Sequence, residues 1–296
     1  MKLVAAIPAF NEEKTIGSVV IGAREYVDEV VVVDDGSFDN TALIAERAGA
    51  KLIRYPSNRG YGAAIRGCLQ YARSNGAGAL VILDGDGQHN PEAIPRVLEP
   101  IVKGVADLSI GSRFLGGEPS GSIPRYRRLG IGLITRLSNL RIRRNGPLRD
   151  AQSGFRAYSR RAIDSIDPRE ADMGASVEIL WAAEEGGLRI VEVPITVDYD
   201  GEGSRKGAIH HGLSVLGSMF RYVETERPLT FLGIPGFGLF LLGLGFGVYV
   251  IDSYNRTLEL PVGLSLVAVL SMVLGTVLGF TGLVLHALTS ANQRYR

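Results

Sequence analysis

Two carboxylates stand one residue apart directly after a short apolar run. The segment reads Asp84-Gly85-Asp86-Gly87-Gln88-His89. In an extended chain Asp84 and Asp86 project to the same face, so both can bind one divalent cation. Carboxylate oxygens suit Mg²⁺ or Mn²⁺, Gln88 adds a neutral oxygen, and a cation with few protein ligands keeps positions open for phosphates. The alternative is an acidic turn, because Asp and Gly both favour turns, and His89 fits a turn cap better than a metal ligand.

Polar side chains also end the two strand-like runs nearest the N-terminus. The first run closes on Pro8-Ala9-Phe10-Asn11-Glu12 and the second on Asp34-Asp35-Gly36-Ser37. Because parallel strands present their carboxyl ends at one edge of a sheet, we expect these residues to share a rim with Asp84. Carboxylates there accept the N–H and O–H groups that a base and a ribose offer. For Asn11 and Ser37 the alternative is a helix cap, which does not exclude contact with a ligand.

A glycine-rich segment, Asn58-Arg59-Gly60-Tyr61-Gly62, resembles a phosphate-binding loop. It lacks the G-x-G-x-x-G spacing of a dinucleotide fold, because the next glycine after Gly62 is Gly67. The spacing therefore disfavours an oxidoreductase.

The elements that position these residues alternate along the first 110 residues. Short apolar runs predict buried strands at 3–7, 30–33, 51–54 and 80–83, and helical stretches lie between them at 12–25, 40–48 and 62–74. Asp39 is a candidate N-cap, Gly49 a candidate C-terminal stop, and Pro91 fits the first turn of the next helix. This alternation predicts an α/β fold with a mostly parallel, doubly wound sheet.

The following segment is less regular. We expect a loop at 116–122, a basic helix at 125–144, a helix at 176–185 and a strand at 189–193. Residues 207–226 mix apolar and basic positions, which favours an interfacial amphipathic helix over an ordinary domain helix.

Composition narrows the function classes. The 296 residues carry a net charge of +1, so no global field indicates nucleic acid as a partner. The single cysteine, Cys68, excludes an intrachain disulfide and a thiolate cluster, and it fits a small buried residue. The chain opens on a strand-like run instead of a signal peptide, so we expect the N-terminal domain to stay in the cytosol.

Two runs near the C-terminus, 229–251 and 262–285, contain no charged residue. Each reaches the roughly 20 residues that cross a hydrocarbon core, whereas a pair of buried core helices is the alternative. Basic residues flank the pair at both ends and only Arg256 lies in the loop between them, so the positive-inside rule places the catalytic domain and both termini in the cytoplasm. The pairs Gly243/Gly247 and Gly275/Gly279 have a spacing that permits close helix contact, within a hairpin or between protomers of a homo-oligomer.

These motifs, together with Gly111-Ser112-Arg113-Phe114, resemble family 2 glycosyltransferases with the Rossmann-like GT-A fold. Asp150-Ala151-Gln152-Ser153-Gly154-Phe155-Arg156-Ala157 and Glu192-Val193-Pro194-Ile195 resemble the dolichyl-phosphate mannose synthase branch, and the two apolar runs resemble polyprenyl-phosphate glycosyltransferases. The resemblance covers roughly residues 1–206. It implies a cytoplasmic GT-A domain at 1–206, a juxtamembrane helix at 207–228, a transmembrane hairpin at 229–288 and a cytoplasmic tail at 289–296.

The resemblance also implies roles for individual residues. The nucleotide-sugar would be held by Pro8, Phe10, Glu12, Val33, Asp35, Asp84, Gly85, Gln88, Arg205 and Lys206. The metal, Mg²⁺ or Mn²⁺, would be held by Asp84, Asp86 and Gln88. The acceptor phosphate would be held by Arg113 with Arg127 or Arg128, whose register stays open. Family members often carry a tyrosine where this chain has Phe10, so a hydroxyl contact is lost there.

The implied reaction moves mannose, glucose or N-acetylglucosamine from a GDP- or UDP-sugar to dolichyl or polyprenyl phosphate, with inversion. A phosphate acceptor is already anionic near neutral pH, since its second pKa is about 6, so a cationic clamp matters more than a strong base. Asp150 and Glu178 are candidates for orienting the acceptor or accepting a proton, and either can instead be structural.

Two other functions stay open. A processive polysaccharide synthase also resembles family 2, but its Gln-x-x-Arg-Trp element is missing, since the only tryptophan, Trp181, follows Glu178-Ile179-Leu180. A non-catalytic, membrane-tethered nucleotide-sugar-binding protein is the second alternative, and the intact set of Asp84, Asp86, Gln88 and Arg113 argues against it.

Overall fold

The computed structural model describes residues 1–115, 131–132, 135–136, 138–139, 141–142, 144–170, 174–197 and 229–294. The chain forms two compact units, Met1–Val215 and Leu216–Arg296. The predicted loop at 116–122, most of the basic segment at 125–144 and the interfacial helix at 207–226 lie outside the described residues, as do Arg127, Arg128, Arg205 and Lys206.

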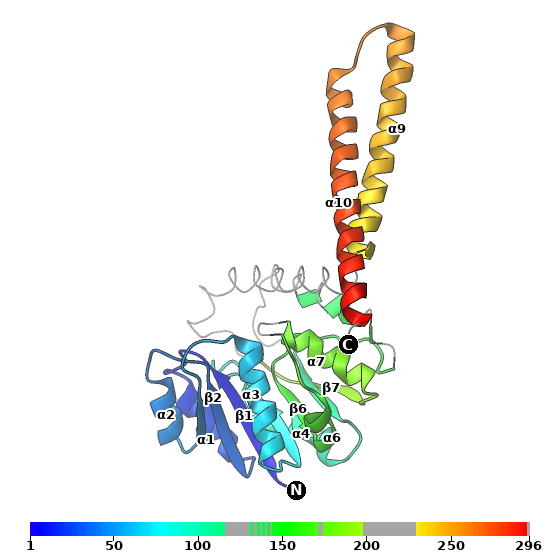
Figure 1. The fold of residues 1–296 in the computed structure, drawn as a ribbon. Helices are drawn as coiled ribbons and strands as arrows, with labels where there is room; N and C mark the ends of the chain where they lie inside the picture. Colours follow the sequence, from blue (N-terminus) through cyan, green and yellow to red (C-terminus); the bar gives the residue numbers. More distant parts are fainter. Residues whose placement is uncertain are drawn as a thin grey trace. The chain divides into compact units, whose positions relative to one another are not determined.

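The first unit is built on one seven-stranded sheet (Figure 1). Its strands are β1 (Leu3–Ala9), β2 (Glu29–Asp34), β3 (Lys51–Arg54), β4 (Ala79–Ile82), β5 (Leu108–Ser112), β6 (Arg156–Ser159) and β7 (Ile190–Pro194), in the order β3-β2-β1-β4-β6-β5-β7. Neighbouring strands are parallel except at β6, which runs antiparallel to both β4 and β5. The predicted α/β class with a mostly parallel sheet is confirmed.

Helices cover both faces of this sheet. The helices are α1 (Ile16–Arg24), α2 (Thr41–Arg47), α3 (Tyr61–Ser74), α4 (Ile94–Val102), α6 (Arg160–Ser165) and α7 (Ala175–Glu185). Alternate residues of β1 belong to two separate hydrophobic cores, one on each face of the sheet. Val4 and Ala6 pack with α3, α6 and α7, whereas Ala5 and Ile7 pack with α1, α2 and α4. Both faces of the strands are therefore buried, which explains their nearly continuous apolar sequence.

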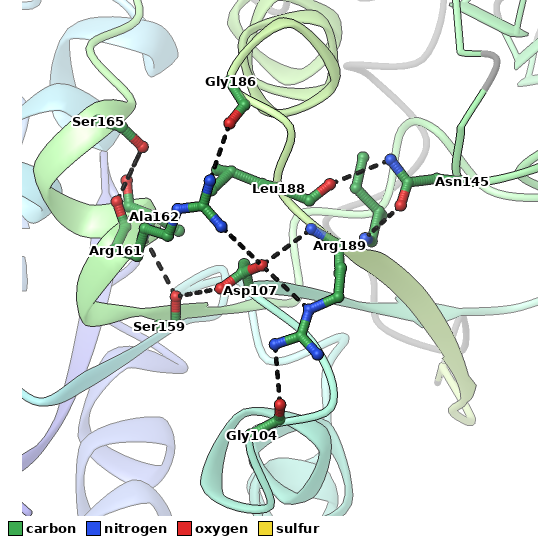
Figure 2. Close-up of polar contacts among 11 residues, drawn as sticks. Gly104, Asp107, Asn145, Ser159, Arg161, Ala162, Ser165, Gly186, Leu188 and Arg189 are labelled. Carbon is green, nitrogen blue, oxygen red and sulfur yellow. Dashed lines mark hydrogen bonds and ion pairs between the residues drawn. The ribbon is translucent and has the colours of Figure 1, made fainter.

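An ion-pair cluster connects the antiparallel strand β6 to β5 and β7, at the amino ends of these two parallel strands. Asp107, just before β5, accepts a hydrogen bond from the Ser159 hydroxyl at 3.3 Å and one from the Arg189 main-chain N–H at 2.9 Å. The Arg161 guanidinium lies 3.9 Å from the same carboxylate (Figure 2). One buried acid thus joins the beginning of β5, the end of β6 and the beginning of β7.

The predicted strands and helices of the first 110 residues are confirmed to within a few residues, except at α1. This helix begins at Ile16 and not at residue 12, because the chain turns through Asn11, whose φ is 57°. As predicted, Gly49 follows the end of α2, with a φ of 94°, and Pro91 opens the turn that leads into α4. This turn is a short 3₁₀ helix, and the Asn90 side chain caps it. Cys68 is buried, as predicted.

The second unit is a helical hairpin (Figure 1). A π-helical turn (η2, Leu229–Gly233) leads into α9 (Ile234–Thr257), which is followed by α10 (Val262–Arg294). Both α9 and the segment Val262–Ala287 are long and apolar enough to cross a membrane. The loop between the two apolar runs is shorter than their bounds indicated, because α9 continues past residue 251 to Thr257. An ion pair of 3.0 Å between Asp252 and Arg256 lies along its last turn.

Glycines set the closest approach of the two long helices. A Cβ at Gly275 would lie 2.5 Å from the Phe240 nitrogen, and one at Gly243 would lie 2.8 Å from the Ala268 oxygen. Side chains at Gly247 and Gly279 would meet nothing within 4 Å. Of the two predicted pairs, Gly243 and Gly275 therefore serve the hairpin contact, whereas the other member of each pair leaves open space at its Cβ position.

Candidate functional site

The strand ends singled out in the sequence meet at one edge of the sheet. Ala9 of β1 pairs with Asp34 of β2, and Ile82 of β4 pairs with Arg156 of β6. Because β6 is inverted, its first residue lies beside the last residues of β4, and Ile110 of β5 lies opposite the same Arg156. The segments that follow β1, β2, β4 and β5 therefore share this edge with the segment that precedes β6.

The Asp84–Gln88 turn is fixed by hydrogen bonds to its main-chain atoms. The Gly85 nitrogen donates to the Pro8 oxygen at 3.3 Å, and the Gly85 oxygen accepts from the Thr15 hydroxyl at 2.7 Å. Asp86 Oδ1 accepts the Gln88 N–H at 3.0 Å. A Cβ at Gly85 would lie 3.3 Å from the Pro8 oxygen, so the backbone is packed against β1. Asp84, Asp86 and Gln88 thus stand on one short turn and not on an extended segment, as in the alternative interpretation. Their role as cation ligands stays a prediction.

Negative charge gathers around this turn. Burial, followed by the charge of Asp86, raises the pKa of Glu12 to about 7, and Asp39 and Asp84 add to the effect. Burial also raises the pKa of Asp84. A cation bound here would stabilise the ionised form of both carboxyl groups.

The residues at this turn fit a divalent cation that takes part of its shell from substrate. Two aspartates supply hard oxygen donors, and among the described residues no group of three or more His, Cys, Asp and Glu forms a complete protein site. His89 is buried, and its Nδ1 has no hydrogen-bond partner and lies 3.6 Å from Asp84 Oδ2. Burial lowers the pKa of His89 to about 4, so this side chain is neutral near pH 7 and adds no positive charge.

Asp35 organises the glycine-rich segment. Its Oδ1 accepts the Arg59 N–H at 2.8 Å and its Oδ2 accepts the Gly60 N–H at 2.9 Å, while burial raises the pKa of its carboxyl group. The interpretation of this segment as a phosphate loop is therefore wrong for these two N–H groups, because a protein carboxylate already holds them. Asp35 lies at the predicted rim, directly after β2.

The segments that follow β1 and β2 are hydrogen-bonded to each other. The Asn11 N–H donates to the Ser37 hydroxyl at 2.9 Å, and Asn11 Oδ1 accepts the Phe38 N–H at 2.9 Å. The cap interpretation of Asn11 and Ser37 is wrong, since α1 begins after Thr15 and α2 after Asn40. The ring of Phe10 lies 5.9 Å from that of Phe38 in an edge contact, and both rings reach solvent.

Pro8 and Val33 are paired in adjacent strands and buried, with Val33 packed in the core on the α3 side. A bound nucleotide would therefore meet Val33 through its main chain. Nothing in the described residues tests the nucleotide role of Pro8, Phe10, Glu12 or Val33, which stays a prediction.

A buried ion pair lies after β5. Arg113 Nε and one terminal nitrogen donate to the two Asp150 oxygens, each at 2.7 Å, and the Arg113 main-chain N–H donates to Asp150 at 3.1 Å. Asp150 is itself fixed, because its N–H donates to Glu192 at 2.8 Å. The structure thus brings the two predicted residues together as a bidentate pair.

Glu178 has a different environment. Its Oε2 accepts the main-chain N–H groups of Arg169 and Glu170, at 2.8 and 2.9 Å. This geometry favours the structural alternative for Glu178.

Four residues of this edge were not predicted to take part in the site, although each belongs to a motif of the family resemblance: Tyr61, Gly154, Arg156 and Glu192. The Tyr61 hydroxyl donates to Asp84 Oδ1 at 3.2 Å, and a Cβ at Gly154 would lie 2.5 Å from Asp84 Oδ2. Arg156 is buried and donates to the carbonyl oxygens of residues 151, 153 and 176. The only sequence signal for these four residues was that each lies in a motif of the family resemblance.

Comparison with known proteins supports the resemblance. The model of the family "Glycosyl transferase family 2" matches residues 5–167. Polyprenol monophosphomannose synthase of Mycolicibacterium smegmatis is 30% identical over 236 residues, which cover 75% of this chain and 86% of the relative. UDP-N-acetylglucosamine–dolichyl-phosphate N-acetylglucosaminyltransferase of Methanococcus voltae is 32% identical, with 65% of this chain and 84% of the relative covered.

Solved structures share the fold. Glucosyl-3-phosphoglycerate synthase of Mycobacterium tuberculosis, crystallised with Mg²⁺ and uridine diphosphate, has a TM-score of 0.59 and 21% identity, with 74% of this chain and 78% of that chain covered. The same protein, crystallised with Mn²⁺, uridine diphosphate and phosphoglyceric acid, has a TM-score of 0.58.

Proposed function

Because this chain belongs to glycosyl transferase family 2, we propose that it transfers a hexose from a GDP- or UDP-sugar to dolichyl or polyprenyl phosphate at a membrane surface. The donated sugar is mannose, glucose or N-acetylglucosamine. The family resemblance drawn from the motifs is confirmed, and the lipid phosphate acceptor is supported by the names of the M. smegmatis and M. voltae relatives.

One observation carries the proposal. The acidic Asp84–Gln88 turn and the Arg113–Asp150 pair lie at the same sheet edge, on the two sides of β6. Joining two anionic substrates requires both charge types: a cation site for the donor diphosphate and a cationic side chain for the acceptor phosphate.

On the donor side, Asp84, Asp86 and Gln88 would hold Mg²⁺ or Mn²⁺ together with the diphosphate. The metal would supply neutralisation of the charge that develops on the leaving diphosphate. Glu12 and Asp35 accept donors of the base and ribose at the neighbouring strand ends, with Pro8, Phe10 and Val33 beside them. Arg205 and Lys206 add positive charge near the diphosphate.

On the acceptor side, Arg113 is oriented by Asp150 and grips the phosphate together with Arg127 or Arg128. The acceptor oxygen is already anionic, so it attacks the anomeric carbon directly and the configuration inverts, through a transition state with oxocarbenium character. Asp150 acts by holding the guanidinium, and not as a base.

The hairpin anchors the enzyme. The helices α9 and α10 cross the bilayer, with the catalytic unit and both termini on the cytoplasmic side, and keep the enzyme at the membrane that holds the lipid acceptor. This topology follows from the distribution of basic residues.

The test is transfer itself. Full-length protein in detergent is incubated with GDP-mannose, UDP-glucose or UDP-N-acetylglucosamine and a polyprenyl phosphate, and the lipid product is measured by mass spectrometry. We expect one sugar to appear on the lipid phosphate, and Asp86→Asn to abolish it. Nucleotide binding without any lipid-linked sugar would contradict the enzymatic proposal.

A further inference from the structure

We infer that Tyr61 is a positioning residue for Asp84: its hydroxyl fixes one oxygen of this carboxylate and leaves the other to the cation that accompanies the donor diphosphate. The inference rests on the proposed function, because it takes Asp84 as a cation ligand. It also gives the Asn58–Gly62 motif a role other than phosphate binding.

The two oxygens of Asp84 have different surroundings. Oδ1 accepts the Tyr61 hydroxyl at 3.2 Å. Oδ2 lies 3.6 Å from His89 Nδ1, which is too long for a hydrogen bond. Because a carboxylate offers acceptor oxygens, the Tyr61 hydroxyl is the donor in this contact.

Tyr61 is held in place from the side of Asp35. It opens α3 directly after Gly60, whose φ of 95° is a conformation that favours glycine. The N–H groups of Arg59 and Gly60 donate to the Asp35 carboxylate, and the Arg59 guanidinium lies 4.7 Å from the Tyr55 ring centroid. Residues 59–61 therefore connect the Asp35 carboxylate, after β2, to the Asp84 carboxylate, after β4.

The opposite side of the pair is packed as well. A Cβ at Gly154 would lie 2.5 Å from Asp84 Oδ2 and 2.9 Å from the Tyr61 oxygen, so this position has no room for a side chain. Tyr61, Gly154 and Arg156 also help to line one small cavity. The Arg156 guanidinium is buried and donates to the Ser153 and Ala151 oxygens, so it fixes the segment that carries Gly154.

A ligand carboxylate that is already hydrogen-bonded loses less orientational freedom when a cation binds. Partners of this kind typically account for about 10–100-fold in metal affinity. Tyr61→Phe removes only the hydroxyl and keeps the ring, so it isolates this contribution.

The test measures Mn²⁺ binding by electron paramagnetic resonance on full-length protein in detergent, with UDP or GDP as the nucleotide. We expect Tyr61→Phe to weaken Mn²⁺ affinity by about 10-fold or more, while nucleotide affinity without metal and the unfolding midpoint change little. A merely structural tyrosine would move the midpoint and leave the Mn²⁺ affinity alone.

Tyr55→Phe is the matched control. Its hydroxyl also bonds the first turn of α3, at the Ala63 oxygen, 3.2 Å away, but it does not contact Asp84. We expect this variant to bind Mn²⁺ like the wild type. Equal Mn²⁺ affinity in Tyr61→Phe and wild type would overturn the inference alone, whereas wild-type protein that binds no Mn²⁺ with either nucleotide would overturn the metal assignment with it.

Discussion

Replacing Arg113 by alanine separates the two roles that its geometry combines. Asp150 is fully buried and the Arg113 side chain is 11% exposed, so solvent screens their bidentate contact very little. Arg113→Ala therefore removes a group that the acceptor phosphate needs, and it also leaves the Asp150 carboxylate without its ionic partner in the interior.

The expected losses of stability and of transfer rate can both be estimated. Breaking a buried ion pair by removing one partner costs about 3–5 kcal/mol of stability. Loss of a charge-assisted contact in a desolvated site lowers a transfer rate by about 30- to 1,000-fold. Arg113→Lys restores only part of the rate, because an ammonium cannot make the bidentate contact. Donor affinity changes far less, since it rests on the strand ends around Glu12 and Asp35.

The assay uses a probe that reports on one unit only. Trp181 is the single tryptophan of the chain and stands on α7, so its fluorescence follows unfolding of the catalytic unit in denaturant. Arg113→Ala, Asp150→Asn and the double variant are compared for unfolding, nucleotide affinity and transfer rate. Because a neutral amide is easier to bury than an unpaired carboxylate, we expect the double variant to be more stable than Arg113→Ala and equally slow in transfer.

Two results would refute this reasoning. Additive losses of stability in the double variant would mean that Arg113 and Asp150 are not coupled. Equal losses of nucleotide affinity and transfer rate in Arg113→Ala would mean that Arg113 serves the donor diphosphate, and the acceptor clamp would then rest on Arg127 or Arg128.

Three further predictions follow from the acidic rim and the hairpin. Asp86→Asn should abolish transfer and weaken donor binding without unfolding the protein, and full wild-type activity in excess chelator would remove the metal from the mechanism. The pKa of Glu12 is raised from 4.5 to about 7, so the contribution of Glu12 to stability is complete below about pH 4.5 and is lost as pH rises through 7. Glu12→Gln should therefore flatten the pH dependence of the unfolding free energy, measured by Trp181 fluorescence. An unchanged pH dependence would contradict the raised pKa. A Cβ at Gly275 would clash within the hairpin, whereas one at Gly245 would meet nothing within 4 Å. Gly275→Leu should therefore lower the yield of monodisperse protein in detergent, and Gly245→Leu should not. Equal yields would count against the close helix contact.

The first half of the sheet could be predicted because its signals are local. Buried parallel strands are short β-branched runs, and Gly49 and Pro91 mark helix boundaries by their own backbone preferences. Strands β5 and β6 were not predicted. For β6 the reason is that Arg156–Ser159 carries a buried arginine and has no apolar run to distinguish it. Its direction depends on partners far away in sequence, such as the contact of Ser159 with Asp107.

Residue types identified the acidic turn, but not how its oxygens are used. The spacing of Asp84 and Asp86 indicates a shared face in any extended segment. That Asp35 holds the Arg59 and Gly60 N–H groups is a tertiary fact, and so is the contact of Tyr61 with Asp84. A glycine-rich segment offers N–H groups to a phosphate and to a carboxylate alike, so its sequence does not distinguish the two.

The inverted strand explains how one sheet edge acquires both charge types. A parallel strand between β4 and β5 would bring its carboxyl end to this edge and continue into a helix. Because β6 runs the other way, the edge receives the segment that leads into it, which carries Asp150 and Gly154. Gly154 packs on Asp84 after β4, whereas Asp150 orients Arg113 after β5. One segment thus contacts an acidic group on one side and a basic group on the other, so a substitution within it should disturb donor and acceptor binding together, whereas substitutions at Asp86 or Arg113 should disturb one of them.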